Sequence, residues 1–378
     1  MTSSSPLQRT HAQAFQVGPD VVRLLRDGAI DHAAMLRAID DARTEILLEM
    51  YWIGADHVGR RFRDALAERA AAGIAVKLIY DAIGSYGAPG DFWAPLLAHG
   101  GEVREFSPIA PWHRRFQLSR IRYRDHRKNL VVDGEVGFAG GINLGDQWAP
   151  EVGPGWRDDA IEVRGPSALR IRQAFFRVWA DLGGEPAEIA APTPEGALVR
   201  VLTNEIGGGP DRAIRSAYLD AIRSARGSIL IASAYFLPGP VFLLALREAA
   251  RRGVKVRILL PARSDVWLVT MATGSIIGRL LADEIQVFAY EGRILHSKTA
   301  VFDETTAIIG SHNLDVMSWR FNLECNVVVE DSAFAAHAAR SFERDCGDAH
   351  SLSLASWRAR PWPLRLTAWF LALFRAFL

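Results

Sequence analysis

One polar motif occurs twice in this chain with identical internal spacing, and this repeat constrains the possible fold more than any other feature. Each copy joins a histidine, a lysine, an aspartate and an asparagine: His126, Lys128, Asp133 and Asn143, and again His296, Lys298, Asp303 and Asn313. Every residue of the first copy lies 170 positions before its counterpart in the second. Equal spacing at four positions indicates an internal duplication.

The segments around the two motifs repeat one alternation of helices and strands. The first half predicts a helix over 31–42, a strand over 46–52, a helix over 58–72 and a strand over 75–80. The second half predicts a strand over 229–235, a helix over 242–252 and a strand over 255–260. Each motif then opens a pair of buried strands, at 130–132 and 136–139 and at 299–302 and 306–309. This alternation predicts an α/β fold whose helices cover a largely buried sheet.

Four parts are expected along the 378 residues. They are a flexible lead over 1–20, a first lobe over 21–190, a second lobe over 191–348 and an amphipathic tail over 349–378. The join is predicted from Gly183-Gly184 to Pro194, because glycine and proline interrupt regular structure.

Lysine is rare in this chain, and its placement indicates a chemical requirement. Only four of the 44 basic residues are lysines, namely Lys77, Lys128, Lys255 and Lys298. Two of the four fall in the motifs, which random placement among the basic sites would produce with a chance of roughly one per cent, so a compact ammonium is favoured over a planar guanidinium.

The residue types of the motifs are those that phosphodiester exchange requires. A histidine and a lysine two positions apart share one face of a strand and can reach one anion. One histidine would attack phosphorus while the other serves as acid and base, and the lysines and asparagines would neutralise the phosphate oxygens. Backbone next to Gly140, Gly141, Gly310 and Ser311 is expected to cradle the phosphate. The sequence contains no competing metal-ligand pattern, so we expect neither a metal nor another cofactor.

An attacking histidine also needs a carboxylate to orient its ring. Two candidates follow the asparagines, Asp158 and Glu324. Asp159 is an alternative to Asp158, which we favour. Glu49 lies in a run of apolar residues and either faces the site or is paired elsewhere.

The duplicated motif, with its Gly-Gly-x-Asn and Gly-Ser-x-Asn segments, resembles the phospholipase D superfamily. Further segments resemble bacterial cardiolipin synthases of the short form: Trp156-Arg157-Asp158, Gly165-Pro166, Leu295-His296-Ser297-Lys298, Gly310-Ser311-His312-Asn313-Leu314-Asp315 and Asn322-Leu323-Glu324-Cys325-Asn326. The resemblance covers about Val21 to Phe342. Ser297 and His312 depart from the residues common in that family, which leaves acceptor preference open.

The resemblance implies two α/β/α sandwich lobes with mixed sheets, pseudo-two-fold symmetry and a phosphatidyl-histidine intermediate. It implies that His126 is the nucleophile and His296 the acid and base, although the residues themselves do not decide which histidine attacks. Asp133 and Asp303 are expected to support the site structurally. The implied location is the cytoplasmic face of a bacterial inner membrane, with peripheral attachment.

Two segments are candidates for binding a membrane surface. Residues 112–128 carry seven basic residues against one acid, and the candidate headgroup contacts are Arg114, Arg115 and Arg120. The same pattern would suit nucleic acid, or an ordinary solvated loop. At the C-terminus, a helix would place Trp369, Phe370 and Phe374 on a broad apolar face. That helix either lies at a membrane interface or packs on the body of the protein or on a second subunit.

The sequence leaves three functions open. The first is a phosphatidyltransferase that makes cardiolipin from phosphatidylglycerol or another donor, with water as a competing acceptor. The second is a phosphodiesterase acting on DNA, which the net charge of +1 and the apolar tail disfavour, so no nucleic acid partner is expected. The third is an inactive scaffold that binds anionic lipid, which two complete motifs disfavour. The apolar segment 266–281 either lines an acyl-chain entrance or packs in the core, and the oligomeric state stays open.

Overall fold

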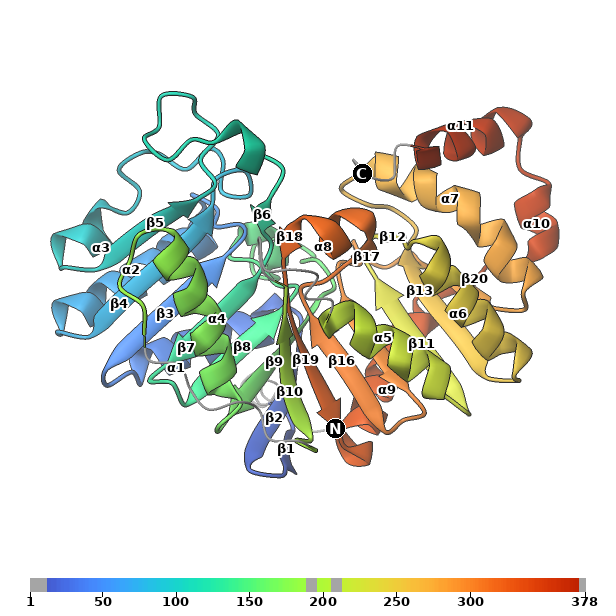
Figure 1. Ribbon diagram of the computed structural model, residues 1–378, viewed down its shortest axis with the longest axis horizontal. Helices are drawn as coiled ribbons and strands as arrows, with labels where there is room; N and C mark the ends of the chain where they lie inside the picture. The colour runs from blue at the N-terminus through green and yellow to red at the C-terminus, as the bar shows by residue number, and fades with distance from the viewer. Residues whose placement is uncertain (1–11, 188–195, 205–212, 374–378) are drawn as a thin grey trace, which may run out of the picture. The chain divides into compact units, whose positions relative to one another are not determined.

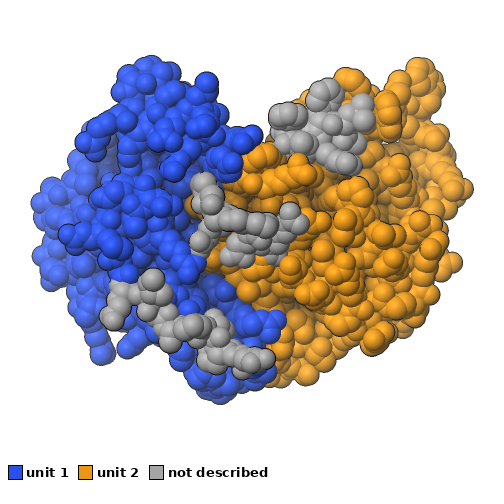
Figure 2. All heavy atoms as spheres, viewed as in Figure 1, with its two compact units in different colours: residues 1–201 blue, residues 202–378 orange. Residues whose placement is uncertain are grey.

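The computed structural model describes residues 12–187, 196–204 and 213–373. The chain divides into two compact units, unit 1 over residues 1–201 and unit 2 over residues 202–378 (Figure 2). Each unit contains its own cluster of buried apolar side chains. The expected organisation in two α/β lobes is therefore confirmed.

Unit 1 is built on an eight-stranded mixed sheet in the order β1-β2-β9-β8-β7-β3-β4-β5 (Figure 1). Its strands are β1 (Ala14–Val17), β2 (Asp20–Arg26), β3 (Glu45–Met50), β4 (Ala75–Asp81), β5 (Glu102–Phe106), β7 (Lys128–Val132), β8 (Val136–Gly140) and β9 (Asp159–Arg164). Its helices are α1 (Gly28–Asp40), α2 (His57–Ala71), α3 (Ala94–Ala98) and α4 (Ala168–Asp181). Strands β3, β4 and β5 are parallel, and β7 joins them antiparallel to β3.

Unit 2 is built on a second eight-stranded mixed sheet, in the order β10-β19-β16-β15-β11-β13-β14-β20. Its strands are β10 (Val199–Thr203), which contains the unit boundary, β11 (Ser228–Ser233), β13 (Lys255–Pro261), β14 (Gln286–Tyr290), β15 (Lys298–Phe302), β16 (Thr306–Gly310), β19 (Cys325–Glu330) and β20 (Ala349–Ser351). The main helices are α5 (Ala213–Ser224), α6 (Pro240–Arg251), α7 (Trp267–Ala282) and α9 (Ser332–Gly347). Short elements are β12 (Phe236–Leu237), β17 (Leu314–Asp315) and α8 (Val316–Arg320).

Six strands have the same order in both sheets. The sequence β9-β8-β7-β3-β4-β5 of unit 1 matches β19-β16-β15-β11-β13-β14 of unit 2. The register matches as well, because Lys128 pairs with Met50 and Lys298 pairs with Ser233 at the last residues of β3 and β11. Strands β7 and β15 are buried along their whole length, as central strands covered on both faces are. The duplication inferred from the motifs is therefore a duplication of the fold.

The N-terminal boundary expected at residue 21 is wrong. Residues Ala14–Val17 form β1, a hairpin partner of β2, and Phe15 and Val17 are buried while the residues between and before them are exposed. Gly18 at the turn has a φ of 56°, which favours glycine. A four-residue strand is too short to stand out by periodicity alone. Of the expected lead, residues 1–11 lie outside the described residues.

The boundary between the lobes also differs from the expected position. It falls between Val201 and Leu202 rather than at residue 190, and residues 188–195 of the expected join lie outside the described residues.

The C-terminal segment belongs partly to unit 2. Residues Ala349–Ser351 add β20 to the edge of the sheet beside β14, followed by α10 (Leu354–Arg358) and α11 (Trp362–Leu373). The expected tail over 349–378 therefore begins as part of the second lobe. Among the helices of the described ranges, none combines the length and apolar character needed to cross a bilayer.

Candidate active site

We call the motif histidine and lysine of each unit a half-site. The first half-site, His126 and Lys128, lies where the parallel strands of unit 1 end. His126 stands two residues before β7 and is buried, with 8% of its surface exposed. Lys128 Nζ donates to the backbone carbonyl oxygen of His126 at 2.6 Å. The ring of Tyr51 packs against both, 4.8 Å from the His126 ring centroid and 4.8 Å from Lys128 Nζ. Ligands of open α/β sheets bind at this edge of a sheet.

The second half-site repeats this arrangement at the end of β11. His296 and Lys298 are buried, and Lys298 Nζ lies 2.9 Å from His296 Nδ1 and 3.3 Å from Nε2. The Tyr235 ring is edge-on to His296 at 6.2 Å between centroids, and its hydroxyl donates to Asp265 at 2.7 Å. Each unit thus holds a histidine with an ammonium beside it, within a low-dielectric setting that strengthens interactions with an anion.

The two asparagines follow β8 and β16 and are both buried. Asn143 Oδ1 accepts a hydrogen bond from the Trp52 N–H at 3.2 Å, which leaves its amide nitrogen as the donor group. In the part of the chain that the structure describes, Asn313 Oδ1 has no hydrogen-bond partner. A buried amide of this kind is a ready contact for a bound polar ligand.

The motif aspartates lie away from the histidines, in turns with positive φ at the far ends of β7 and β15. Asp133 accepts the backbone N–H groups of Arg43, Thr44 and Glu45 at 2.8–3.0 Å. Asp303 does the same for the loop before β11. Burial raises the pKa of each carboxyl, but these hydrogen bonds outweigh it and hold the pKa below its ordinary value. Both aspartates thus fasten a helix–strand loop.

The two carboxylates predicted to orient the histidines occupy matching positions. Asp158 and Glu324 are fully buried and immediately precede β9 and β19. Asp158 accepts from the Trp148 indole at 3.1 Å, and the Ser311 hydroxyl donates to Glu324. Asp159 instead forms an ion pair with Arg157 at 2.8 Å, so Asp158 is the better counterpart of Glu324. Contact of either carboxylate with a histidine remains a prediction.

The motif glycines are accounted for by packing within each sheet. A Cβ at Gly140 would lie 2.5 Å from Ala160 Cα, and one at Gly310 would lie 2.3 Å from the Cys325 carbonyl oxygen. A Cβ at Gly141 would approach Asp158 Oδ1 to 2.2 Å. These contacts exclude larger side chains, and the phosphate-cradle role assigned to this backbone stays a prediction.

Two buried acidic residues, Glu49 and Asp125, lie close to the first half-site in the sheet and in the chain. Glu49 accepts from Asn129 at 3.0 Å and from Arg127 at 3.4 Å, so it is paired within the sheet. Burial raises the pKa of Asp125 well above its ordinary value, and the nearby Glu49 carboxylate raises it further while Arg127 lowers it. This environment favours the protonated form of Asp125, directly before His126.

Unit 2 has a different buried carboxyl near its half-site. Asp315 caps α8 by accepting the Ser318 N–H at 2.7 Å. Burial raises the pKa of Asp315 to about 7, and the Glu324 carboxylate contributes to the increase against the hydrogen bond from Ser318. Asp315 therefore titrates near neutral pH, where it adds a charge next to the half-site.

Sequence reasoning missed the aromatic neighbours of the histidines, Tyr51 and Tyr235. The echo between the two halves could have revealed them, because each closely follows a strand paired with a motif strand. Tyr51 stands one residue after the end of β3, and Tyr235 stands two residues after the end of β11. The unusual His312, by contrast, is buried with its ring 4.0 Å from the Trp319 ring centroid. It contributes to an aromatic cluster of unit 2.

The basic segment is smaller than its sequence indicates. Arg124 is buried and paired with Asp81 at 3.3 Å, and Arg127 is buried with Glu49. The expected headgroup contacts fare differently: Arg114 and Arg120 are exposed, whereas Arg115 is half-buried and donates to the Leu182 carbonyl oxygen at 3.4 Å. Trp112 is also 87% exposed. We call residues 107–123 the basic loop.

The last described helix, α11, packs on α7 of unit 2 through Ala368. Ala368 is 2% exposed and faces Gly274 of α7, whose Cβ position is 3.5 Å from Ala368 Cβ. Trp369 and Phe370 remain 54% and 53% exposed. Phe374 lies outside the described residues. The helix therefore packs on the body of the protein, one of the two alternatives, and still presents apolar side chains outward, while its attachment to a membrane interface stays a prediction.

Within the described residues, no three histidine, cysteine, aspartate or glutamate side chains gather as metal ligands would. The groups available at each half-site are donors and bases rather than an acidic cage. They can neutralise a phosphate with ammonium and amide groups.

Comparison with known proteins identifies relatives over most of the chain. Residues 35–150 and 218–346 match a family model described as cardiolipin synthase, PLD-like domain. Cardiolipin synthase A of Pseudomonas aeruginosa is 36% identical over 332 residues, which cover 86% of this chain and 66% of the relative. Cardiolipin synthase of Geobacillus thermodenitrificans is 32% identical over 371 residues, covering 93% and 72%. The chain thus spans about two thirds of the length of the curated relatives it matches.

A solved structure extends the comparison to the fold. Phosphatidylserine synthase of Haemophilus influenzae superposes with a TM-score of 0.76 at 13% identity, covering 98% of both chains. Polyphosphate kinase of Porphyromonas gingivalis gives a TM-score of 0.60 at 14% identity, covering 88% of this chain and 49% of the other. At such identities the likeness concerns the fold alone.

Proposed function

Because the chain belongs to the cardiolipin synthase family of phospholipase D-like proteins, we propose that it is a phosphatidyltransferase. The proposed reaction makes cardiolipin from phosphatidylglycerol or another phospholipid donor. One observation carries the proposal: the same buried histidine–lysine half-site occurs at the same register of both sheets. A reaction with two proton-transfer steps needs two such histidines.

In the proposed mechanism His126 attacks the phosphorus of the donor through a ring nitrogen. The bond between phosphorus and the glycerol oxygen breaks, and His296 gives the leaving oxygen its proton. The hydroxyl of a second phosphatidylglycerol then passes its proton to His296 and attacks phosphorus, which breaks the bond to His126. The net products are cardiolipin and glycerol, and His126 and His296 return to their initial states.

The cations and amides act on the phosphate oxygens in this proposal. Lys128 and Lys298 neutralise negative charge, and Asn143 and Asn313 donate hydrogen bonds through their amide nitrogens. The support for this assignment is local: both lysines lie against their motif histidines, and Asn143 has its oxygen held by Trp52. The backbone at Gly140, Gly141, Gly310 and Ser311 is proposed to approach the same phosphate.

Four carboxylates are proposed to support the reacting groups. Asp158 and Glu324 orient the histidine rings, a role that their complete burial and matching positions favour. Asp133 and Asp303 serve structure, because their hydrogen bonds go to the loops before β3 and β11.

We further propose that the protein reaches its substrates at a membrane surface, with no nucleic acid partner. Exposed cations of the basic loop, among them Arg114 and Arg120, would attract anionic headgroups. The exposed Trp369 and Phe370 of α11 would enter the interface. Attachment of this kind is peripheral.

The test incubates the purified protein with phosphatidylglycerol vesicles in the presence of a chelator and resolves the lipid products. Cardiolipin and glycerol in equal amounts are expected for the wild type. The His126→Ala variant should form neither, while His99→Ala, a change at an exposed histidine of unit 1, should match the wild type. The chelator addresses the expectation of a metal-free site.

Other outcomes lead to different functions. Phosphatidic acid without cardiolipin would identify a hydrolase of the phospholipase D type. Absence of lipid turnover, together with cleavage of single-stranded DNA, would replace the lipid proposal by a nuclease.

A further inference from the structure

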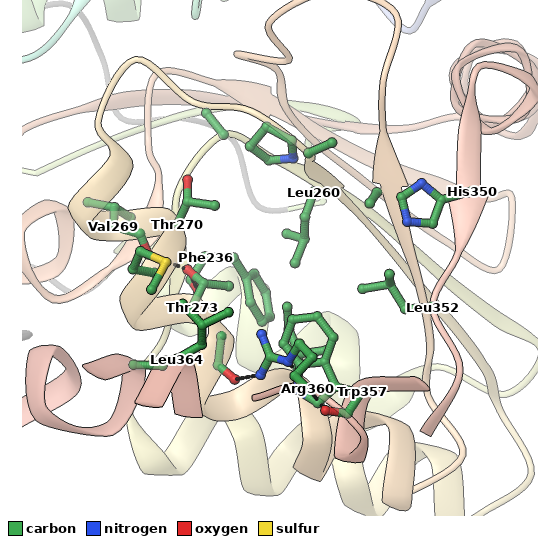
Figure 3. A pocket seen from close by; sticks show the side chains of 18 residues that line it. Phe236, Leu260, Val269, Thr270, Thr273, His350, Leu352, Trp357, Arg360 and Leu364 are labelled. Atoms are coloured by element: carbon green, nitrogen blue, oxygen red, sulfur yellow. Dashed lines mark hydrogen bonds between the residues drawn. The ribbon is translucent and has the colours of Figure 1, made fainter. Parts of the chain in front are cut away.

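An apolar cavity of about 280 Å³ lies in unit 2, where residues of α7, α10 and α11 line part of it (Figure 3). Its walls include Phe236, Leu260, Val269, Leu352 and Trp357. Two of the polar side chains around it are engaged with protein atoms: Thr273 Oγ1 donates to the Phe236 carbonyl oxygen at 2.9 Å, and Arg360 lies on the Trp357 ring. The cavity therefore presents carbon surface, which selects an apolar ligand.

The cavity begins one residue from the second half-site. The Ala234 N–H donates to the Ser297 carbonyl oxygen at 3.0 Å, directly after His296. Ala234 and Phe236 line the cavity, while the ring of Tyr235 between them lies against His296. One short stretch of chain therefore forms the wall between the cavity and the reacting histidine.

Another part of the wall belongs to α11, the helix that exposes apolar side chains. Leu364 and Ala368 of α11 line the cavity, and Leu366, Trp369 and Phe370 of the same helix are each more than half exposed. The cavity thus lies between an apolar outer surface and a half-site built for phosphate. A phospholipid has the same order of parts, with an apolar chain on one side and a phosphate on the other.

We propose that this cavity binds one fatty acyl chain of the phospholipid substrate while its phosphate occupies the half-site of His296 and Lys298. This inference rests on the function proposed above and names the part of the substrate that unit 2 recognises. Unit 1 differs at this point. The position after β3 that corresponds to Ala234 is occupied by Tyr51, whose ring packs on His126.

Filling the cavity tests the proposal. Gly274 lines it, and a Cβ there would make only ordinary contacts of 3.5–3.8 Å with Ala368, Arg360 and Trp357, so Gly274→Leu can extend into the empty space. The next residue on α7, Ser275, does not line this cavity, and Ser275→Leu is the matched control. Unfolding curves of both variants would verify that each is folded.

The activity measurement compares octanoyl and palmitoyl phosphatidylglycerol, each at equal mole fraction in the same detergent micelles. We expect Gly274→Leu to raise KM for the palmitoyl substrate by at least about tenfold. This is the affinity lost when roughly two methylene groups of the acyl chain no longer have apolar surroundings. KM for the octanoyl substrate should change little, and Ser275→Leu should match the wild type for both. Equal losses for both chain lengths, or no loss for either, would overturn the proposal.

A binding measurement separates this inference from the proposed reaction. Fluorescence of a conjugated polyene fatty acid reports burial of the chain without turnover. The wild type and Ser275→Leu should bind it alike, and Gly274→Leu should bind it at least about tenfold more weakly. Cardiolipin synthesis without such binding would overturn the cavity proposal alone. Binding that is lost in Gly274→Leu, in a protein without phospholipid turnover, would support the acyl site and overturn the proposed reaction.

Discussion

Each unit has the same six-stranded core and a half-site of the same kind. The units differ in the segments that follow the ends of their parallel strands. In unit 1 the connection from β4 to β5 contains only the five-residue α3, and the basic loop follows β5. In unit 2 the connection from β13 to β14 is the sixteen-residue α7, which covers the apolar cavity. Only residues 291–297 then lead to the second motif.

This difference indicates which parts of a duplicated fold stay alike and which parts diverge. The sheet and the half-site are constrained in both units by the same hydrogen bonds, such as those of Asp133 and Asp303. The connections carry no such constraint and can specialise, as loops on a rigid scaffold generally do. Unit 1 presents exposed cations suited to headgroups, and unit 2 presents apolar surface suited to chains. The predictions below probe where the units are equivalent and where they are not.

The largest expected effect separates the roles of the two histidines. With a phosphatidyl p-nitrophenyl ester the leaving group needs no proton, so His296→Ala should release a burst of about one p-nitrophenolate per protein and then stall. His126→Ala should show no burst, and steady turnover should fall at least about 10³-fold in both variants. Rapid-mixing absorbance measures the burst. A burst in His126→Ala and none in His296→Ala would reverse the assignment.

The second largest expected effect tests whether the two motif lysines are equivalent. Lys128→Arg and Lys298→Arg should each lower kcat by about 10²-fold, because a planar guanidinium does not fit the position of a compact ammonium. The loss should be greater for Lys298→Arg, since Lys298 contacts the ring of His296 whereas Lys128 contacts the carbonyl oxygen of His126. Steady-state kinetics with phosphatidylglycerol provides the comparison. The exposed Lys255→Arg is the control, and equal activity of all three variants would refute the requirement for lysine.

A third prediction concerns a buried charge found near the half-site of unit 2. The pKa of Asp315 is raised to about 7, above the ordinary value of about 3.9, so its favourable contribution to folding is full below about pH 4 and is lost as the pH rises through about 7. Asparagine can keep the cap on α8 without titrating. Asp315→Asn should therefore be more stable than the wild type at about pH 8, by ~1–3 kcal/mol, and closer to it at about pH 5. Denaturant unfolding at the two pH values measures this difference, and a difference independent of pH would contradict it.

The smallest expected effect distinguishes the two modes of membrane binding. The double variant Arg114→Glu with Arg120→Glu should bind anionic vesicles about tenfold more weakly, and this loss should shrink at high salt. Trp369→Ser should weaken binding in a way that salt does not change, because its contribution is apolar. Arg251→Glu, an exposed change on α6, serves as the charge control. Vesicle co-sedimentation gives all three values, and identical salt dependence for all variants would remove the distinction between the units.

Much of the fold was predictable because its signals are local. The predicted runs 130–132 and 299–302 do form strands, and the observed helices and central strands begin and end within a few residues of the predicted positions. The motif spacing also places His126 beside Lys128 and His296 beside Lys298, because strand geometry links neighbours in sequence.

The pairings of buried charges were not predictable in this way. Arg124 and Arg127 belong to a basic run, yet their partners Asp81 and Glu49 lie 43 and 78 residues away in the chain. Only the sheet brings these residues together. A charged side chain that gains a buried partner leaves the surface, so counting charges along the sequence overestimates the basic loop.

The sequence by itself determined the duplication and the α/β class, and it singled out the histidines, lysines and asparagines proposed to react, because these follow from periodicity and from repeated local motifs. The tertiary structure alone decided that α11 docks through Ala368 with its aromatic side outward, and that Leu364 and Ala368 of this helix line a cavity together with Ala234 and Phe236. A cavity depends on side chains from several strands and helices at once, and the volume that they leave unfilled cannot be read from any one segment.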